Sequence, residues 1–142
     1  MKRNLFVILS FFIILIVILT YVYYNYIKIN LIAEQTNKEF EKYTIDSITG
    51  SSLITLINKT IDENEKNNVQ KDRKGNYIEN DKDSIKIEIK FSESNKTFSM
   101  ESVNNLGVEA FVKNYNNILF KCIKKEYHKN TNKIKYMLFE QL

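Results

Sequence analysis

The sequence predicts an α+β fold. An N-terminal transmembrane helix continues into a stalk helix, and a small head follows with an antiparallel sheet and two helices. Three patterns carry this prediction: Leu5–Tyr24 is almost wholly apolar, Leu53–Ile61 repeats apolar residues at helical spacing, and Ser84–Phe91 alternates apolar with mostly charged residues. Strands that are not separated by repeated helical crossovers favour an antiparallel sheet beside the helices.

Composition divides the chain into two kinds of material. The chain has 142 residues, 44% of them hydrophobic, and a net charge of +4. Within Leu5–Tyr24 all residues but Ser10 and Thr20 are hydrophobic, against about 36% of the remaining chain. This excludes a two-domain enzyme and a transporter with several spans, and a single cysteine excludes an intrachain disulfide. The expected parts are an anchor at 1–24, a stalk at 25–48 and a head at 49–142.

The apolar run Leu5–Tyr24 predicts a membrane span. Its length at ~1.5 Å per residue matches the ~30 Å core of a bilayer, and no charge lies between Arg3 and Lys28. A cleaved signal peptide is the alternative, but its apolar region is shorter and ends in small residues. Here the run ends in tyrosines, which suit a membrane interface, and no alanine precedes Ala33. We therefore expect an uncleaved anchor.

The basic residues Lys2 and Arg3 predict the orientation of this anchor, because positive residues flanking a first span stay in the cytoplasm. Lys28 opposes this orientation, but it is single and lies further from the apolar run. We expect a cell-membrane protein with a cytoplasmic N-terminus and with residues 25–142 outside the cytoplasm.

The helices are expected in three places. A loose apolar stripe predicts a helix over 25–46, continuous with the anchor. Thr49–Ser52 breaks the chain and offers N-cap residues, and the helix that follows ends near 65–68. Apolar residues at helical spacing predict a further helix over 102–115, with Gly107 as its weak point.

The strands follow from alternation and turn residues. Val69–Asp72 and Tyr77–Asn80 flank a plausible hairpin turn. Ser84–Phe91 is the clearest strand, with one apolar face and one wet face. A turn over Ser92–Lys96 leads to a return strand at Thr97–Met100. Two further strands are expected near the C-terminus, at Ile118–Tyr127 and Ile134–Gln141.

The C-terminal hairpin carries the whole net charge of the chain. Six lysines in residues 118–142 face only two glutamates, and such a one-sided hairpin could capture a polyanion such as a wall polymer, lipid headgroups or DNA. The alternative interpretation is a solvated strand face whose lysines protect a sheet edge. The candidate polyanion-contact residues are Lys121, Lys124, Lys125, Lys129, Lys133 and Lys135.

No catalytic, cofactor or metal site is predicted. One cysteine and one histidine, Cys122 and His128, are too few for a zinc site, and on one strand they would lie ~20 Å apart, too far for proton transfer. The acidic segment 79–83 fails the EF-hand pattern. Among 21 basic residues only two are arginine, which disfavours a nucleic-acid partner.

The layout of a short basic start, an apolar helix, an amphipathic continuation and a small head ending in strands resembles type IV pilins and pseudopilins of Gram-positive bacteria. The stretch Thr49–Lys59 is similar to a segment of small anchored or pilin-like proteins of that low-GC group. The family's processing motif is absent, because no glycine precedes Leu5 and the first glutamate is Glu34. No functional residue is therefore carried over from the family.

The expected function is that of a non-enzymatic, single-pass membrane protein that acts by contact, as an accessory component of an envelope, secretion or pilus-like assembly. Its partners would be the lipid bilayer, through Leu5–Tyr24, and other envelope or pilus-like proteins. The alternative is an extracytoplasmic binding module that captures a polyanion through the basic hairpin. The absence of Walker, nucleophile-elbow and zinc-protease motifs weighs against an enzyme.

Overall fold

The computed structural model of the chain describes residues 2–92 and 96–142, without the side chains at three positions near the N-terminus. The chain divides into two compact units, Met1–Ile32 and Ala33–Leu142. We call them the N-terminal unit and the head. The boundary falls inside the first helix, α1 (Lys2–Glu41), so the last residues of this helix belong to the head.

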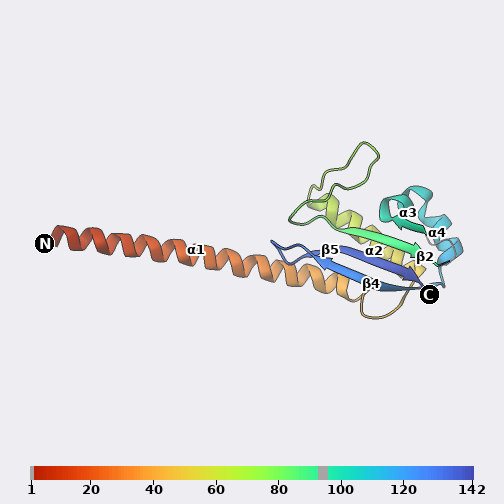
Figure 1. Ribbon diagram of the computed structural model, residues 1–142, viewed down its shortest axis with the longest axis horizontal. Coiled ribbons are helices and arrows are strands. Elements are labelled where there is room, and N and C mark those ends of the chain that lie inside the picture. Colours follow the sequence, from red (N-terminus) through yellow and green to blue (C-terminus); the bar gives the residue numbers. More distant parts are fainter. Residues whose placement is uncertain (1, 93–95) are drawn as a thin grey trace. The chain divides into compact units, whose positions relative to one another are not determined.

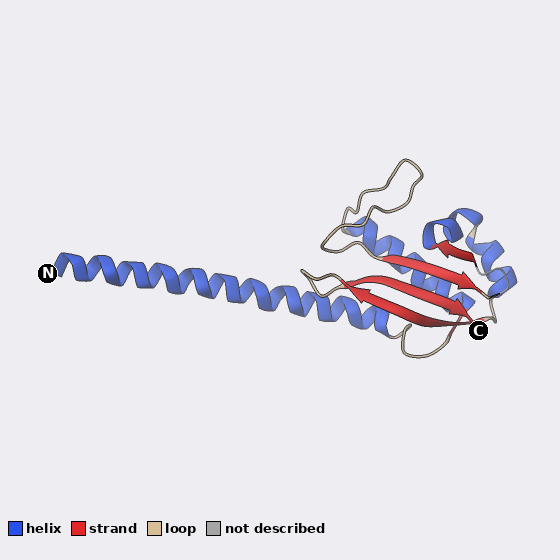
Figure 2. Cartoon of the chain, viewed as in Figure 1, coloured by secondary structure: helices blue, strands red, loops and turns tan. Residues whose placement is uncertain are grey.

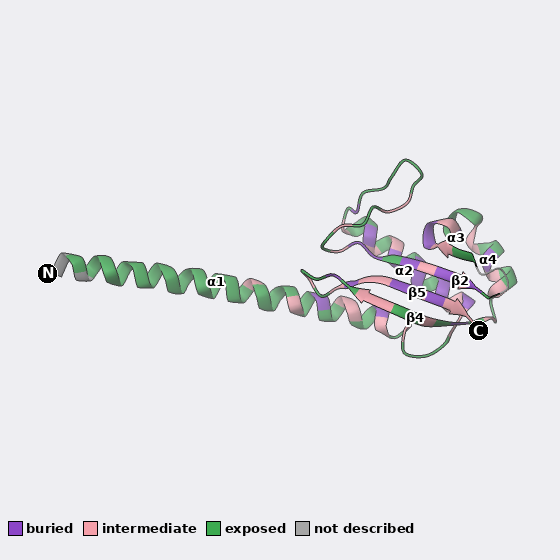
Figure 3. Ribbon diagram, viewed as in Figure 1, coloured by how far each residue is buried: buried purple, intermediate pink, exposed green. Residues whose placement is uncertain are grey.

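The N-terminal unit is a single apolar helix, and its described large apolar side chains are exposed. Figure 3 shows this part of α1 exposed along nearly all of its described length. The helix is long and apolar enough to cross a bilayer, by length and composition. Its serine and threonine hydroxyls bond within the helix, since Ser10 donates to the Val7 carbonyl at 2.8 Å and Thr20 to that of Ile16 at 2.8 Å. The predicted long apolar N-terminal helix is confirmed.

The head is built on a five-stranded sheet with helices packed against one face, which confirms the α+β fold class (Figure 2). The order across the sheet is β1-β4-β5-β2-β3. The strands are β1 (Ile48–Thr49), β2 (Lys86–Phe91), β3 (Lys96–Ser99), β4 (Leu119–Tyr127) and β5 (Ile134–Gln141).

The sheet is mixed, and this corrects the expectation of a purely antiparallel one. Three neighbouring pairs are antiparallel, but β2 and β5 run parallel, with Ile87 beside Met137 and Ile89 beside Phe139. β5 is flanked on both sides, by its hairpin partner β4 and by β2. Its buried residues Ile134, Met137 and Phe139 suit this central place, because a strand between two others loses most of its exposure to water.

Three helices of the head cover one face of the sheet: α2 (Gly50–Lys66), α3 (Met100–Leu106) and α4 (Val108–Tyr115). Figure 1 shows α2 running behind the strands. Within the predicted break at Thr49–Ser52, Thr49 is the residue that caps α2, and its hydroxyl accepts a hydrogen bond from the Ser52 amide. The predicted helix over 102–115 is two helices instead of one, because Gly107 adopts φ +96° between them.

The core of the head joins α1, α2, the sheet and the two short helices. Phe40 of α1 is buried with Leu53 and Ile57 of α2, and the rings of Phe120 and Phe139 close the cluster from the sheet. An ion pair from Lys59 of α2 to Glu39 lies beside Phe40. The end of α1 is therefore part of the folded head.

Helix α1 ends at Glu41, earlier than the predicted end at residue 46. The Tyr43 amide donates to the Phe40 carbonyl at 3.0 Å, and the Thr44 amide to that of Glu41 at 2.8 Å. These tight turns replace the helical pattern once Phe40 has entered the core.

The predicted hairpin turn at 73–76 is present, and the Asp72 amide donates to the Asn76 carbonyl at 2.8 Å. The flanking segments pair through an isolated antiparallel bridge, Lys71 with Tyr77, and do not form the expected strands. The tip of the turn is organised by the Asp72 carboxylate, which accepts from the amides of Lys74 at 2.7 Å and Asn76 at 2.9 Å. Few apolar side chains alternate here, so a ladder would bury little. The tip of the predicted turn over Ser92–Lys96 lies outside the described residues.

Two asparagine side chains take the place of strand neighbours. The Asn64 amide donates to the Ile85 carbonyl and accepts from the Ile85 amide, both at 2.8 Å, and Asn64 is fully buried. Asn37 of α1 makes a comparable pair of bonds at the hairpin between β4 and β5. Its side-chain amide donates to the Asn132 carbonyl at 2.7 Å, and its side-chain oxygen accepts from the Ile134 amide at 2.8 Å. They tie α2 and the end of α1 to the backbone of the sheet region.

Candidate functional site

The face of the sheet opposite the buried core carries a lattice of paired charges. Lys90 of β2 contacts Glu140 of β5 at 2.7 Å, and Lys86 contacts Glu88 at 2.7 Å. The Tyr136 hydroxyl donates to Glu88 at 2.8 Å. Because alternate residues of a strand share one face, these side chains form a polar surface over β2 and β5.

The ionisation of this lattice reflects its partial burial. Burial opposes ionisation of Glu88, but hydrogen bonds from Lys86 and Tyr136 outweigh it and lower the pKa of this carboxyl group. Burial and the bond to Glu88 raise the pKa of the Tyr136 phenol. Glu88 is therefore the charged acceptor and Tyr136 the neutral donor near neutral pH.

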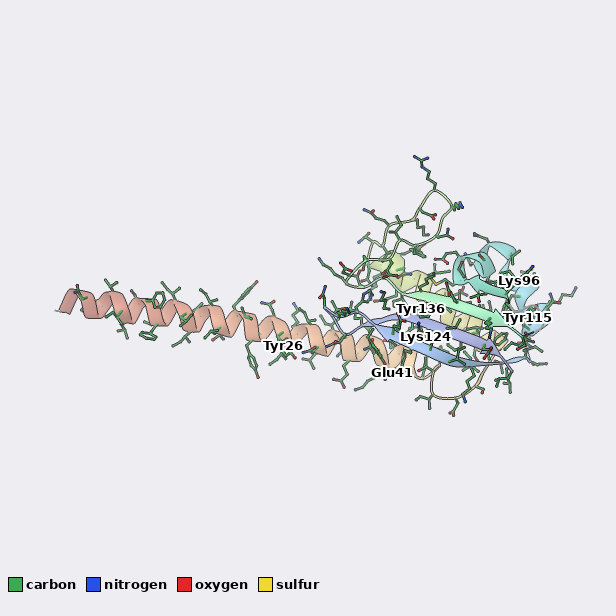
Figure 4. All side chains as sticks on the ribbon, viewed as in Figure 1. Tyr26, Glu41, Lys96, Tyr115, Lys124 and Tyr136 are labelled. Carbon is green, nitrogen blue, oxygen red and sulfur yellow. The ribbon has the colours of Figure 1, made fainter. Side chains whose placement is uncertain are left out.

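Of the six candidate lysines, Lys121 and Lys124 lie on this polar face. Lys121 stands opposite Glu140 in the register of β4 and β5. Lys124 pairs with Glu126 at 2.7 Å, and its ammonium lies 5.6 Å from the centre of the Tyr136 ring. Figure 4 labels Lys124 and Tyr136 over neighbouring strands of the sheet.

A bulge in β4 separates Lys125 from these two lysines. The register shifts between Cys122 and Lys124, so Lys125 stands opposite Met137, on the core side of the sheet. There its ammonium contacts Glu41 at 3.7 Å and the Thr44 hydroxyl at 3.4 Å. Lys125 therefore links β4 to the C-terminal end of α1 within the head.

The remaining candidates lie near the turn between β4 and β5. Lys129 is exposed and Lys133 partly buried in this turn, and Lys135 pairs with Glu79. Lys125, Lys129 and Lys135 line a hollow of about 730 Å³, which Asp81 and Glu126 also line. The structure therefore distributes the six lysines over two faces and a turn, and Lys124, Lys125 and Lys135 form ion pairs with glutamates.

Cys122 and His128 have separate structural roles. The Cys122 thiol donates to the Lys124 carbonyl at 3.4 Å, and burial raises its pKa. The buried His128 ring hydrogen-bonds the Ser84 carbonyl at 2.8 Å and so fastens the turn between β4 and β5 to the preceding loop. Within residues 2–92 and 96–142 no group of three or more His, Cys, Asp or Glu residues could hold a metal ion.

The acidic segment that fails the EF-hand pattern forms a self-contained turn. The Asn80 side-chain oxygen accepts from the amides of Lys82, Asp83 and Ser84 at 2.9–3.1 Å, and its amide donates to Asp83. These hydrogen bonds within the turn account for its asparagine and aspartate side chains.

Sequence patterns did not reveal two hollows in the head. One is an apolar groove of about 400 Å³ between the β2–β3 hairpin and the helices α3 and α4, with Phe91, Phe98, Phe111 and Tyr115 in its wall. The other, of about 270 Å³, contains the buried Glu101. Glu101 lies in an unremarkable helical stretch, and burial of a glutamate has no sequence signal.

Comparison with protein families, with curated proteins and with solved structures finds no match to this chain.

Proposed function

We propose that the chain is a single-pass membrane protein that holds a folded α+β head outside the cytoplasm and acts by contact with other envelope components. The observation that carries the proposal is the N-terminal unit, an apolar helix whose large side chains are exposed throughout. In water this surface would strongly favour association, whereas a bilayer is the solvent that it matches.

The head supports a role in contact rather than chemistry. Many of its charged side chains form ion pairs, as on the open face of the sheet, where Lys90 contacts Glu140 and Lys86 contacts Glu88. Cys122 and His128 each serve a backbone partner. An accessory part of an envelope, secretion or pilus-like assembly needs an anchor and a stable display surface, and both fit this organisation.

Membrane insertion is tested by extracting the membrane fraction with alkaline carbonate. The full chain should stay in the pellet and be released by detergent. Release by carbonate alone would contradict an inserted helix. The intact mass of the extracted protein then distinguishes an uncleaved anchor from a processed chain, because cleavage beyond Tyr24 would remove the span.

Orientation is tested with single cysteines in a Cys122→Ser background. Asn130 lies exposed in the turn between β4 and β5, and Asn4 lies exposed near the N-terminus. A membrane-impermeant maleimide should label the N130C variant on intact cells and the N4C variant only after permeabilisation. The reverse pattern would contradict an external head. Cross-linking from N130C then identifies its neighbours in the envelope.

A further inference from the structure

The hollow that contains Glu101 has one more carboxyl group than ammonium groups in its wall. It has a volume of about 270 Å³ and lies where the loop before β2 meets the open face of the sheet. Tyr77 comes from this loop, Glu101 from α3 and Tyr136 from β5. Three lysines and four glutamates also contribute to the wall, counting Glu101 among the glutamates.

All three lysines of the wall are ion-paired with glutamates of the same wall. Lys86 contacts Glu88 at 2.7 Å, and Lys124 contacts Glu126 at 2.7 Å. Lys135 pairs with Glu79. Within each pair the two opposite charges cancel. The carboxyl group that remains without a lysine partner in this wall is that of Glu101.

Glu101 is almost fully buried, with 6% of its surface exposed. Its Oε1 accepts a hydrogen bond from the Tyr77 amide at 3.2 Å. Its Oε2 is buried and has no hydrogen-bond donor within the described part of the chain. A buried acceptor without a donor carries a substantial free-energy cost, more so when it is charged. A carboxylate oxygen in this position is suited to a donor supplied by another molecule.

We propose that this hollow binds a ligand with a primary ammonium group, which donates to Glu101 through small movements of the wall. A hydrogen bond between ions is shorter and stronger than a neutral one, and one ammonium balances the one unpaired carboxylate. A metal ion would instead need several oxygen ligands. This inference does not depend on the membrane proposal.

The ammonium group could belong to a free amine or to a lysine side chain of a partner protein. Two probes distinguish these sources: n-butylamine, and a lysine tripeptide blocked at both ends. The full chain in detergent micelles is titrated with each probe, and the Tyr77 amide is followed by NMR because it donates to Glu101. The uncharged n-butanol is the control ligand.

We expect saturable shifts of the Tyr77 amide with n-butylamine and none with n-butanol. Glu101→Gln should weaken amine binding by roughly tenfold or more, since it removes the charge but keeps the shape. The control Glu109→Gln alters an exposed carboxylate of α4 outside this hollow, and binding should change by less than threefold. Saturation with the tripeptide alone would assign the site to a partner's lysine and would equally support the proposal.

The proposal is overturned if neither probe gives a saturable shift of the wild-type chain, or if n-butanol binds as well as n-butylamine. It is also overturned if E101Q keeps the wild-type affinity. The wild-type comparison of charged with uncharged probes remains decisive if E101Q does not fold.

Discussion

The N-terminal unit and the head use the same apolar residue types in opposite ways. Large apolar side chains between Phe6 and Tyr24 are 40–71% exposed, whereas the core of the head, including Leu53, Ile87 and Phe139, is 0–8% exposed. The head therefore buries its apolar core residues within its own fold, whereas the apolar side chains of the N-terminal unit face its surroundings. In a bilayer a single helix is a stable structure, because its backbone groups are hydrogen-bonded within the helix.

Apolar content alone therefore does not locate a core. What distinguishes the two regions is the charged residues between the apolar ones. In the head, charged residues interrupt the apolar ones with the period of a helix or strand and leave a wet face. In Leu5–Tyr24 no charge interrupts them.

The largest expected effect comes from charging the N-terminal unit. The double substitution Ile14→Lys with Leu15→Lys places two ammonium groups near the middle of the span, at a cost of about 5–7 kcal/mol for insertion. The variant should leave the carbonate-resistant fraction or be degraded, while I14L with L15I should behave as wild type. Retention of the lysine variant in the carbonate pellet would show that this helix is held by something other than the bilayer core.

The same aromatic deletion should act differently in the two units. Phe139→Ala leaves a cavity in the centre of the sheet core, and we expect the free energy of unfolding of the head to fall by about 3–5 kcal/mol. Phe12→Ala, in the exposed N-terminal unit, should change it by less than about 0.5 kcal/mol. Urea unfolding of the full chain in detergent, followed by tyrosine fluorescence of the head, measures both. Equal losses would mean that the two units unfold together.

The two bridging asparagines lie in different environments within the head, because the Asn64 bonds are buried and the Asn37 bond to Asn132 is exposed. Asn64→Ala leaves the buried amide and carbonyl of Ile85 without partners, and should cost about 2–4 kcal/mol. Asn37→Ala removes the equivalent bonds at a site that water can reach, and should cost about 1 kcal/mol. Urea midpoints at constant m-value test this order. A smaller loss for N64A than for N37A would contradict the strand-substitute role of Asn64.

The smallest effect concerns the open face of the sheet. The pKa of Glu88 is lower in the folded chain than its ordinary value of 4.5. Its stabilising contribution is therefore present above about pH 4.5 and is lost as the pH falls through the lower folded-state value. Glu88 is partly exposed, so the contribution should be below about 1 kcal/mol. Glu88→Gln should flatten the acid side of the stability–pH curve, and an unchanged slope would contradict this.

Much of the fold follows from local patterns. The alternation at Ser84–Phe91, the caps at Thr49 and the break at Gly107 all mark elements or ends that the structure has. The parallel pairing of β2 with β5 does not follow, because these strands are far apart in sequence and either direction would bury the same apolar faces.

The number of lysines in the C-terminal hairpin could be read from the sequence, but not which of these lysines share a surface. Strict alternation along β4 would place Lys121 and Lys125 on one face and Lys124 on the other. The bulge between Cys122 and Lys124 instead puts Lys121 with Lys124 and turns Lys125 toward the core side. One extra residue in the strand thus divides a charge cluster that looks continuous in sequence.

The sequence by itself determined the apolar N-terminal helix, the α+β composition of the head and most element boundaries. These depend on the spacing of apolar residues and on turn and cap residues, which act over a few positions. Only the tertiary structure decided the parallel strand pair, the partners of the six lysines and the burial of Glu101. These depend on which distant segments come together, and that is settled by packing of the whole core rather than by any local preference.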